Sequence, residues 1–384
     1  MRLAWIDALK GFGILLVVFA HYMLPQALDT YIFSFHMPLF FFVSGFVFNF
    51  VKYSESAANF IKRRFRSLII PYFAFAVITL LFYFLLDELY TPEVVSFKIF
   101  GAGIFHIVYS IIFSQTTMIS YNGPLWFLTC LFVTELFFFG LAKRYFWQPV
   151  KLGIWLIMAG IIGYLYSVYI PFRLPWNADV ALTAVVFYGT GNLFRRLIDS
   201  RILLDSNENR SDSSCFRDPN SKFSNMYFRI ENFVSVFFIL VSLLYFAYLL
   251  KYPTDKINMS GLIYGEFFSF YFLAFSGIFT FVYILKKIGS VAILEYYGRN
   301  SLIVLALHFP MKDILIKLSS LIFDMGIDCF AYTTSFAVAL TVLNLLGLMP
   351  VIFLINRYFP LLAGKRSYSK SFKSLKARSS NRIK

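Results

Sequence analysis

The chain has 384 residues, of which 59% are hydrophobic and 14% are charged, and its formal net charge is +15. Soluble domains carry about 25% charged residues, so the composition excludes an ordinary soluble protein and indicates an all-α, polytopic integral membrane protein. In such a protein, basic residues gather in cytoplasmic loops that face anionic lipids. We therefore expect these basic residues to interact with membrane lipids and not with nucleic acid.

Apolar runs of a length that can cross a bilayer recur along the whole chain. They predict about ten transmembrane helices, near residues 9–26, 32–51, 68–87, 124–142, 152–170, 178–196, 232–251, 262–285, 300–323 and 331–357. Every second loop is basic: 52–67, 143–151, 195–232 and 286–299. Because Lys and Arg mark cytoplasmic loops, both termini are expected in the cytoplasm.

One further stretch, residues 99–113, is apolar and contains His106. If it crossed the membrane, every later basic loop would face outward, against the positive-inside rule. We therefore predict that 88–123 is a single external segment with an interfacial or re-entrant helix, and that His106 is an interfacial residue.

The domain organisation follows from the same pattern. Residues 1–360 are expected to form one membrane domain, interrupted by a flexible cytoplasmic loop at 197–231 that is rich in Ser and Asn. Residues 361–384 form a basic cytoplasmic tail. The three cysteines, Cys130, Cys215 and Cys329, are scattered, so no disulfide framework and no metal site is predicted.

Histidines stand inside the first two apolar runs. From the helical rise, His21 lies about 18 Å above the inner edge of a core about 30 Å thick, and His36 lies about 8 Å below the outer edge. Both are then in the outer half, on consecutive helices that pack as antiparallel neighbours. This predicts a shared polar site in which a histidine acts as general base towards a hydroxyl. The alternative is a pair of histidines hydrogen bonded between helices for packing.

A second polar pair is possible in the inner half of the membrane. Glu135 and His308 fall there by the same arithmetic. A contact between them would orient an imidazole or neutralise two buried groups.

The block from Lys62 to Arg66 is strongly basic. Arg63 and Arg66 are three residues apart and would share a helical face, where two guanidinium groups can hold phosphates bidentately. The alternative is a cluster that only sets the topology of the chain.

Five blocks in this order resemble the acyltransferase family 3 membrane proteins, which include sugar and polysaccharide O-acetyltransferases. They are RLAWIDALKGFGILLVVFAHY, FSFHMPLFFFVSGF, RRFRSLIIPYF, GPLWFLTCLF and YYGRNSLIVLALHFP. The resemblance implies a ten-span enzyme of the bacterial plasma (inner) membrane. Such an enzyme moves an acetyl group from cytoplasmic acetyl-CoA to a hydroxyl of a cell-surface glycan or lipid-linked sugar.

The resemblance also implies roles for single residues. His21 would be the catalytic histidine, with His36 and the acidic position Asp7 as further catalytic residues. Arg63 and Arg66 match an R-x-x-R motif that is tied to the acyl donor, and Arg2 matches the arginine that precedes Asp7. Two alternatives remain open at this point: another donor such as succinyl-CoA, and a glycan or small-molecule transporter.

Overall fold

The computed structural model describes residues 3–89, 104–114, 120–208, 220–323 and 334–365. Within these ranges the chain is helical and forms no β-strand, apart from one isolated antiparallel bridge between Asn258 and Ile263. The all-α class predicted from the composition is therefore confirmed.

The longer helices follow the apolar runs of the sequence. They are α1 (Ala4–Ala20), α2 (Gln26–Val47), α4 (Ile70–Leu89), α7 (Trp126–Tyr145), α8 (Pro149–Tyr169), α9 (Ala178–Glu208), α10 (Asn220–Lys251), α11 (Phe267–Ile288), α13 (Ser301–Phe323) and α14 (Thr334–Tyr358). The shorter elements are α3 (Ala57–Arg64), the π-helical turn η1 (Phe65–Ile69), α6 (Ile104–Phe113), η2 (Ser120–Leu125), η3 (Pro175–Asn177), η4 (Met259–Gly261) and α12 (Ala292–Arg299).

Among the described residues, 7 helical stretches are long and apolar enough to cross a membrane. They are Gln26–Val47, Ala57–Leu85, Asn122–Tyr145, Pro149–Tyr169, Asn232–Lys251, Phe267–Ile288 and Thr334–Tyr358. The other predicted spans coincide with α1, α9 and α13. The chain is therefore a polytopic helical membrane protein, whereas the count of ten spans and the cytoplasmic termini stay predictions.

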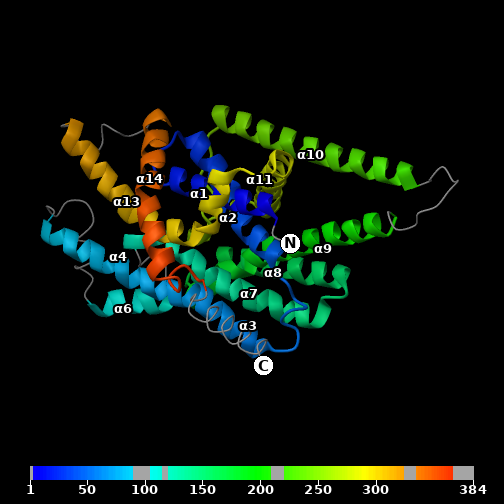
Figure 1. Cartoon of the computed structure of the whole chain (residues 1–384), viewed down its shortest axis with the longest axis horizontal. Helices are drawn as coiled ribbons and strands as arrows, with labels where there is room; N and C mark the ends of the chain where they lie inside the picture. Colours follow the sequence, from blue (N-terminus) through cyan, green and yellow to red (C-terminus); the bar gives the residue numbers. More distant parts are fainter. Residues whose placement is uncertain (1–2, 90–103, 115–119, 209–219, 324–333, 366–384) are drawn as a thin grey trace, which may run out of the picture.

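Helix α2 lies at the centre of the bundle and packs on α1, α9 and α11 (Figure 1). The backbones of α2 and α9 lie in direct contact at two glycines. A Cβ atom on Gly45 would lie 1.8 Å from the carbonyl oxygen of Tyr188, and one on Gly191 would lie 2.0 Å from that of Phe42. Glycines let membrane helices approach this closely. In contrast, the part of α10 from Asn232 to Lys251 is apolar and only 11% of its apolar window is buried, as expected for a helix that faces lipid.

The ambiguous stretch at 99–113 contains α6, which has 10 residues. At about 1.5 Å per residue, this helix is about 15 Å long, half the thickness of the hydrocarbon core. Two of its carbonyls hold it against the bundle: Ile111 accepts from the Tyr72 hydroxyl at 2.7 Å, and Ile112 accepts from the Trp176 indole at 2.8 Å. The described helix alone does not reach across the membrane, and the external placement of 88–123 stays a prediction. Residues 99–103 lie outside the described part of the chain.

Helix occupies much of the segment predicted as a flexible loop at 197–231. Helix α9 continues to Glu208 and α10 begins at Asn220. Figure 1 shows both helices extending beyond the rest of the bundle on the same side. Residues 209–219 and most of the predicted basic tail lie outside the described residues.

Candidate active site

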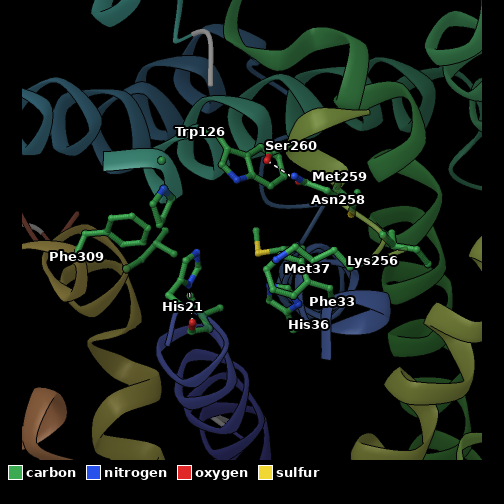
Figure 2. A pocket seen from close by; sticks show the side chains of 15 residues that line it. His21, Phe33, His36, Met37, Trp126, Lys256, Asn258, Met259, Ser260 and Phe309 are labelled. Atoms are coloured by element: carbon green, nitrogen blue, oxygen red, sulfur yellow. Dashed lines mark hydrogen bonds between the residues drawn. The ribbon is translucent and has the colours of Figure 1, made fainter. Parts of the chain in front are cut away.

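A pocket of about 240 Å³ lies where α1 ends. Segments far apart in the sequence line it: Val17, His21, Phe33, His36, Met37, Gly123, Pro124, Trp126, Lys256, Ile257, Asn258, Met259, Ser260, Leu305 and Phe309. Figure 2 shows His21 on one side of this pocket, with His36 and Met37 across from it. The structure therefore brings together the two histidines that the sequence places at similar depth.

His21 is the first residue after α1, and its ring is held by its own helix. Its Nδ1 lies 2.6 Å from the carbonyl oxygen of Val17. A carbonyl oxygen can only accept, so Nδ1 carries the hydrogen and Nε2 is the unprotonated nitrogen of the neutral ring. The ring also packs edge-on against Phe309, with centroids 4.8 Å apart. This arrangement leaves Nε2 as an oriented proton acceptor.

His36 is held in the same way on α2. Its Nδ1 lies 2.8 Å from the carbonyl oxygen of Ile32, and its ring packs edge-on against Phe33 with centroids 4.9 Å apart. The side chain is buried. The pocket therefore has two histidines of one tautomer, each with Nε2 as its only acceptor nitrogen.

The segment between α10 and α11 contributes polar groups that the sequence analysis did not single out. Lys256 lies over the Phe33 ring, 4.2 Å from its centroid, and its Nζ is 3.0 Å from Oδ2 of Asp29. Ser260 donates to Oδ1 of Asn258 at 2.7 Å. One available signal was Lys256 itself, a cation in a loop predicted to be external, where the positive-inside rule disfavours lysine.

This pocket segment is tied to two other parts of the chain. Arg173 donates to the carbonyl oxygen of Ser260 at 2.8 Å and forms an ion pair with the buried Asp179 at 2.7 Å. On the other side, the Thr30 hydroxyl donates to the carbonyl oxygen of Thr254 at 3.2 Å. These bonds fix the segment against the starts of α9 and α2.

Asp7 lies apart from the pocket. It is buried near the start of α1, and Arg299 of α12 lies 3.4 Å from its Oδ2. Fourteen residues of helix separate Asp7 from His21, a distance of about 21 Å. The structure thus gives Asp7 no direct contact with the pocket, and its role stays a prediction. Arg2 lies outside the described residues.

Arg63 and Arg66 are both exposed and follow the end of α2 that lies away from the pocket. Arg63 lies in the last turn of α3, with its guanidinium carbon 5.8 Å from the centroid of the Tyr53 ring, whereas Arg66 lies within the π-helical turn η1. The continuous α-helical register that we expected between them is therefore interrupted. Such π turns are rare and often occur at functional sites.

The predicted contact between Glu135 and His308 is wrong. Glu135 is buried and pairs instead with Arg64, whose Nε lies 2.9 Å from its Oε2. Tyr188 donates to the other carboxylate oxygen at 3.4 Å. His308 lies against His21, with ring centroids 5.1 Å apart. The two residues lie at different levels of the bundle. Glu135 lies with Arg64 near the end of α2 that is away from the pocket, whereas His308 lies beside His21.

No three His, Cys, Asp or Glu side chains gather as a metal site in the part of the chain that the structure describes. The two pocket histidines, each with an unprotonated Nε2, suit proton transfer.

The comparison with protein families gives one match. The model of the acyltransferase domain of acyltransferase family 3 matches residues 3–355. No curated protein and no solved structure matches the chain. The matched range includes the whole pocket and the α3–η1 segment. Because this match covers nearly the whole length, the chain belongs to acyltransferase family 3 and is a membrane-embedded acyltransferase.

Proposed function

We propose that this acyltransferase moves an acetyl group from cytoplasmic acetyl-CoA to a hydroxyl of a cell-surface glycan or lipid-linked sugar, in the bacterial plasma membrane. The observation that carries the proposal is the fixed tautomer of His21, which leaves Nε2 unprotonated at the pocket. Because the chain belongs to an enzyme family, we prefer an acyltransferase to the transporter alternative.

The chemical step follows from this geometry. Nε2 of His21 takes the proton of the acceptor hydroxyl while the hydroxyl oxygen attacks the thioester carbonyl. The tetrahedral intermediate then collapses, the carbon–sulfur bond breaks, and the CoA thiolate leaves with the proton from His21. General-base help of this kind contributes about 10²–10⁴ in rate.

The remaining pocket walls suit a sugar. Trp126, Phe33 and Phe309 offer apolar ring faces, and Asn258 and Ser260 offer hydrogen-bonding groups (Figure 2). Binding sites of this kind combine aromatic walls with a few polar groups that fix orientation. The acceptor would therefore lie between the aromatic rings with one hydroxyl at His21.

The donor would approach from the other end of the bundle. The CoA phosphates are anionic, and the exposed guanidinium groups of Arg63 and Arg66 can pair with them. The sequence places eleven residues of α2, about 16 Å of helix, between His36 and its far end. The long, thin pantetheine arm would have to cover this distance between the helices.

Two measurements test the proposal. Surface glycans of cells with and without the gene, compared by mass spectrometry, should differ by an acetyl increment. Purified protein in liposomes should transfer radiolabel from [¹⁴C]acetyl-CoA to that glycan. If label is transferred from succinyl-CoA but not from acetyl-CoA, the donor is succinyl-CoA. If no label is transferred from either, the proposal is overturned.

A further inference from the structure

His36 is the second histidine of the pocket, and the step proposed above does not use it. Its Nδ1 donates to the carbonyl oxygen of Ile32, 2.8 Å away, so its Nε2 can only accept a hydrogen bond. Within the described structure this Nε2 has no hydrogen-bond partner. Because unpartnered polar atoms are rare in buried side chains, this one calls for an explanation.

The Nε2 atoms of His21 and His36 are open to the pocket, unlike that of His308. The Nε2 of His308 also has no partner in the described structure, but it is sealed from solvent. The side chain of His36 is only 2% exposed, and its Nε2 is not among the sealed atoms, so the exposed part of the ring includes Nε2. His21 and His36 line the pocket from opposite sides (Figure 2). The pocket therefore offers two acceptor nitrogens to one ligand.

The size and the lining of the pocket suit a single sugar residue. Its volume is about 240 Å³, below the roughly 300–1,000 Å³ of pockets for drug-sized ligands. Among the described residues, no Asp or Glu lines it. Each sugar hydroxyl carries one O–H that can donate to an imidazole nitrogen. A ligand with a single hydroxyl would leave one of the two nitrogens without a donor.

We propose that His36 is a specificity-determining residue, whose Nε2 accepts a hydrogen bond from a second hydroxyl of the sugar residue that reacts at His21. This inference rests on the proposed transfer to a sugar hydroxyl. The acceptor is then a sugar residue with at least two free hydroxyls, and the one bound at His36 determines which hydroxyl reaches His21. Sites built to bind a hydroxyl reject analogues that lack it, because the protein group is left unpaired.

The ring of His36 is fixed well enough to select a hydroxyl. It is held by the carbonyl oxygen of Ile32 and packs edge-on against Phe33, with ring centroids 4.9 Å apart. Phe33 is itself covered by the ammonium group of Lys256, 4.2 Å from its centroid. His36 also stands on α2, at the centre of the bundle. Groups placed on rigid helices are positioned more precisely than groups on loops.

The test uses full-length protein in liposomes and follows the release of CoA thiol from acetyl-CoA. The parent acceptor is whichever of methyl α-D-gluco-, galacto- and mannopyranoside gives the fastest release, and its monodeoxy analogues each lack one hydroxyl. His36→Phe keeps a ring but has no acceptor, whereas His36→Gln keeps an acceptor oxygen. Ser34→Ala is the control, because it removes a buried hydrogen bond of α2 outside the pocket lining.

We expect two analogues to fail in wild type, for different reasons. One lacks the reacting hydroxyl and accepts no acetyl group from any variant. The other lacks the hydroxyl bound at His36, so its kcat/KM should be at least about tenfold below that of the parent sugar. His36→Phe should use this second analogue and the parent sugar equally, within about twofold. His36→Gln and Ser34→Ala should still discriminate between them.

Three results would overturn this inference alone. Wild type could use every analogue that retains the reacting hydroxyl as well as the parent sugar. His36→Phe could discriminate as wild type does, or it could transfer to no sugar at all, and in both cases His36 does not act through a second hydroxyl. If His36→Phe is not monodisperse, His36→Leu takes its place under the same criteria. Absence of sugar-dependent thiol release in wild type overturns the proposed function together with this inference.

Discussion

At the scale of the single residue, the chemistry depends on which ring nitrogen of His21 is free. Replacing His21 by Ala removes the proton acceptor but only enlarges the pocket at the end of α1, so we expect folded, inserted protein with transfer lowered at least about 10²-fold. Label transfer from [¹⁴C]acetyl-CoA measures this, with acetyl-CoA affinity as the check on folding. A variant that keeps more than about a tenth of the wild-type turnover would disprove the general-base role. His36→Ala should also lower the turnover.

The two exposed arginines allow a test that separates donor binding from topology. Lysine keeps the positive charge of Arg66 but loses the planar fork that pairs with phosphate. We therefore expect Arg66→Lys and Arg63→Lys to weaken acetyl-CoA binding at fixed ionic strength, whereas the neighbouring Lys62→Arg should bind like wild type. If both lysine variants also bind normally, the cluster only sets topology. The donor site would then have to be sought among Arg195, Arg196, Lys286 and Lys287.

The two pocket histidines could be placed from the sequence because helical rise converts residue number into depth. The residues that lie next to these two histidines could not be predicted. Glu135 and His308 were placed at similar depth because each apolar run was taken to begin at the membrane edge, whereas the structure puts Glu135 beside Arg64 and His308 beside His21. Lys256 was missed because its position depends on bonds from Thr30 and Arg173 to its loop, which join segments distant in sequence.

At the scale of the element, the glycine contact between α2 and α9 controls how the central helices pack. Gly45→Ala and Gly191→Ala would each place a methyl group at or below 2.0 Å from a backbone carbonyl oxygen, and backbone cannot move aside easily. We expect both variants to lower the melting temperature in detergent and the yield of monodisperse protein. Gly140→Ala on α7 is the matched control, since nothing lies within 4 Å of its new Cβ. Because alanine has a higher helix propensity than glycine, Gly140→Ala should leave the melting temperature unchanged or raise it slightly. Equal melting temperatures for all three would contradict the close crossing.

The apolar runs predicted the long helices because a membrane span needs a continuous apolar length. Two shorter features had no such signal. Helix α12 is amphipathic and is separated from α13 only by Asn300. The π turn after α3, Phe65–Ile69, lies across the predicted boundary between the basic loop 52–67 and the span 68–87. Packing holds α12 in place: Gly298 lies against the backbone of Asp7, where a Cβ would be 1.8 Å from the carbonyl oxygen.

At the scale of the whole molecule, the predicted sidedness puts the α3–η1 segment in the cytoplasm and the pocket segment outside. Glu55, in the turn just before α3, and Asp255, in the pocket segment between α10 and α11, are both exposed. In a background without the native cysteines, Glu55→Cys should react with an impermeant thiol reagent only from the cytoplasm, and Asp255→Cys only from outside. Labelling of both from the same side would refute the predicted topology, and with it the separate approach of donor and acceptor.

Each of the three described histidines that lie at or behind the pocket directs Nδ1 at a carbonyl oxygen of its own helix. This common arrangement predicts a common spectroscopic signature. In protein with ¹⁵N-labelled histidine, solid-state NMR near neutral pH should show three ring systems with a protonated Nδ1 and a bare Nε2. Saturating the protein with a donor analogue that cannot react should leave these signals unchanged. The backbone carbonyl oxygens fix the tautomers before either substrate binds. Nε2–H signals from these rings in the resting enzyme would contradict this view. The enzyme would then have to change tautomer before each turnover instead of starting from one that its helices maintain.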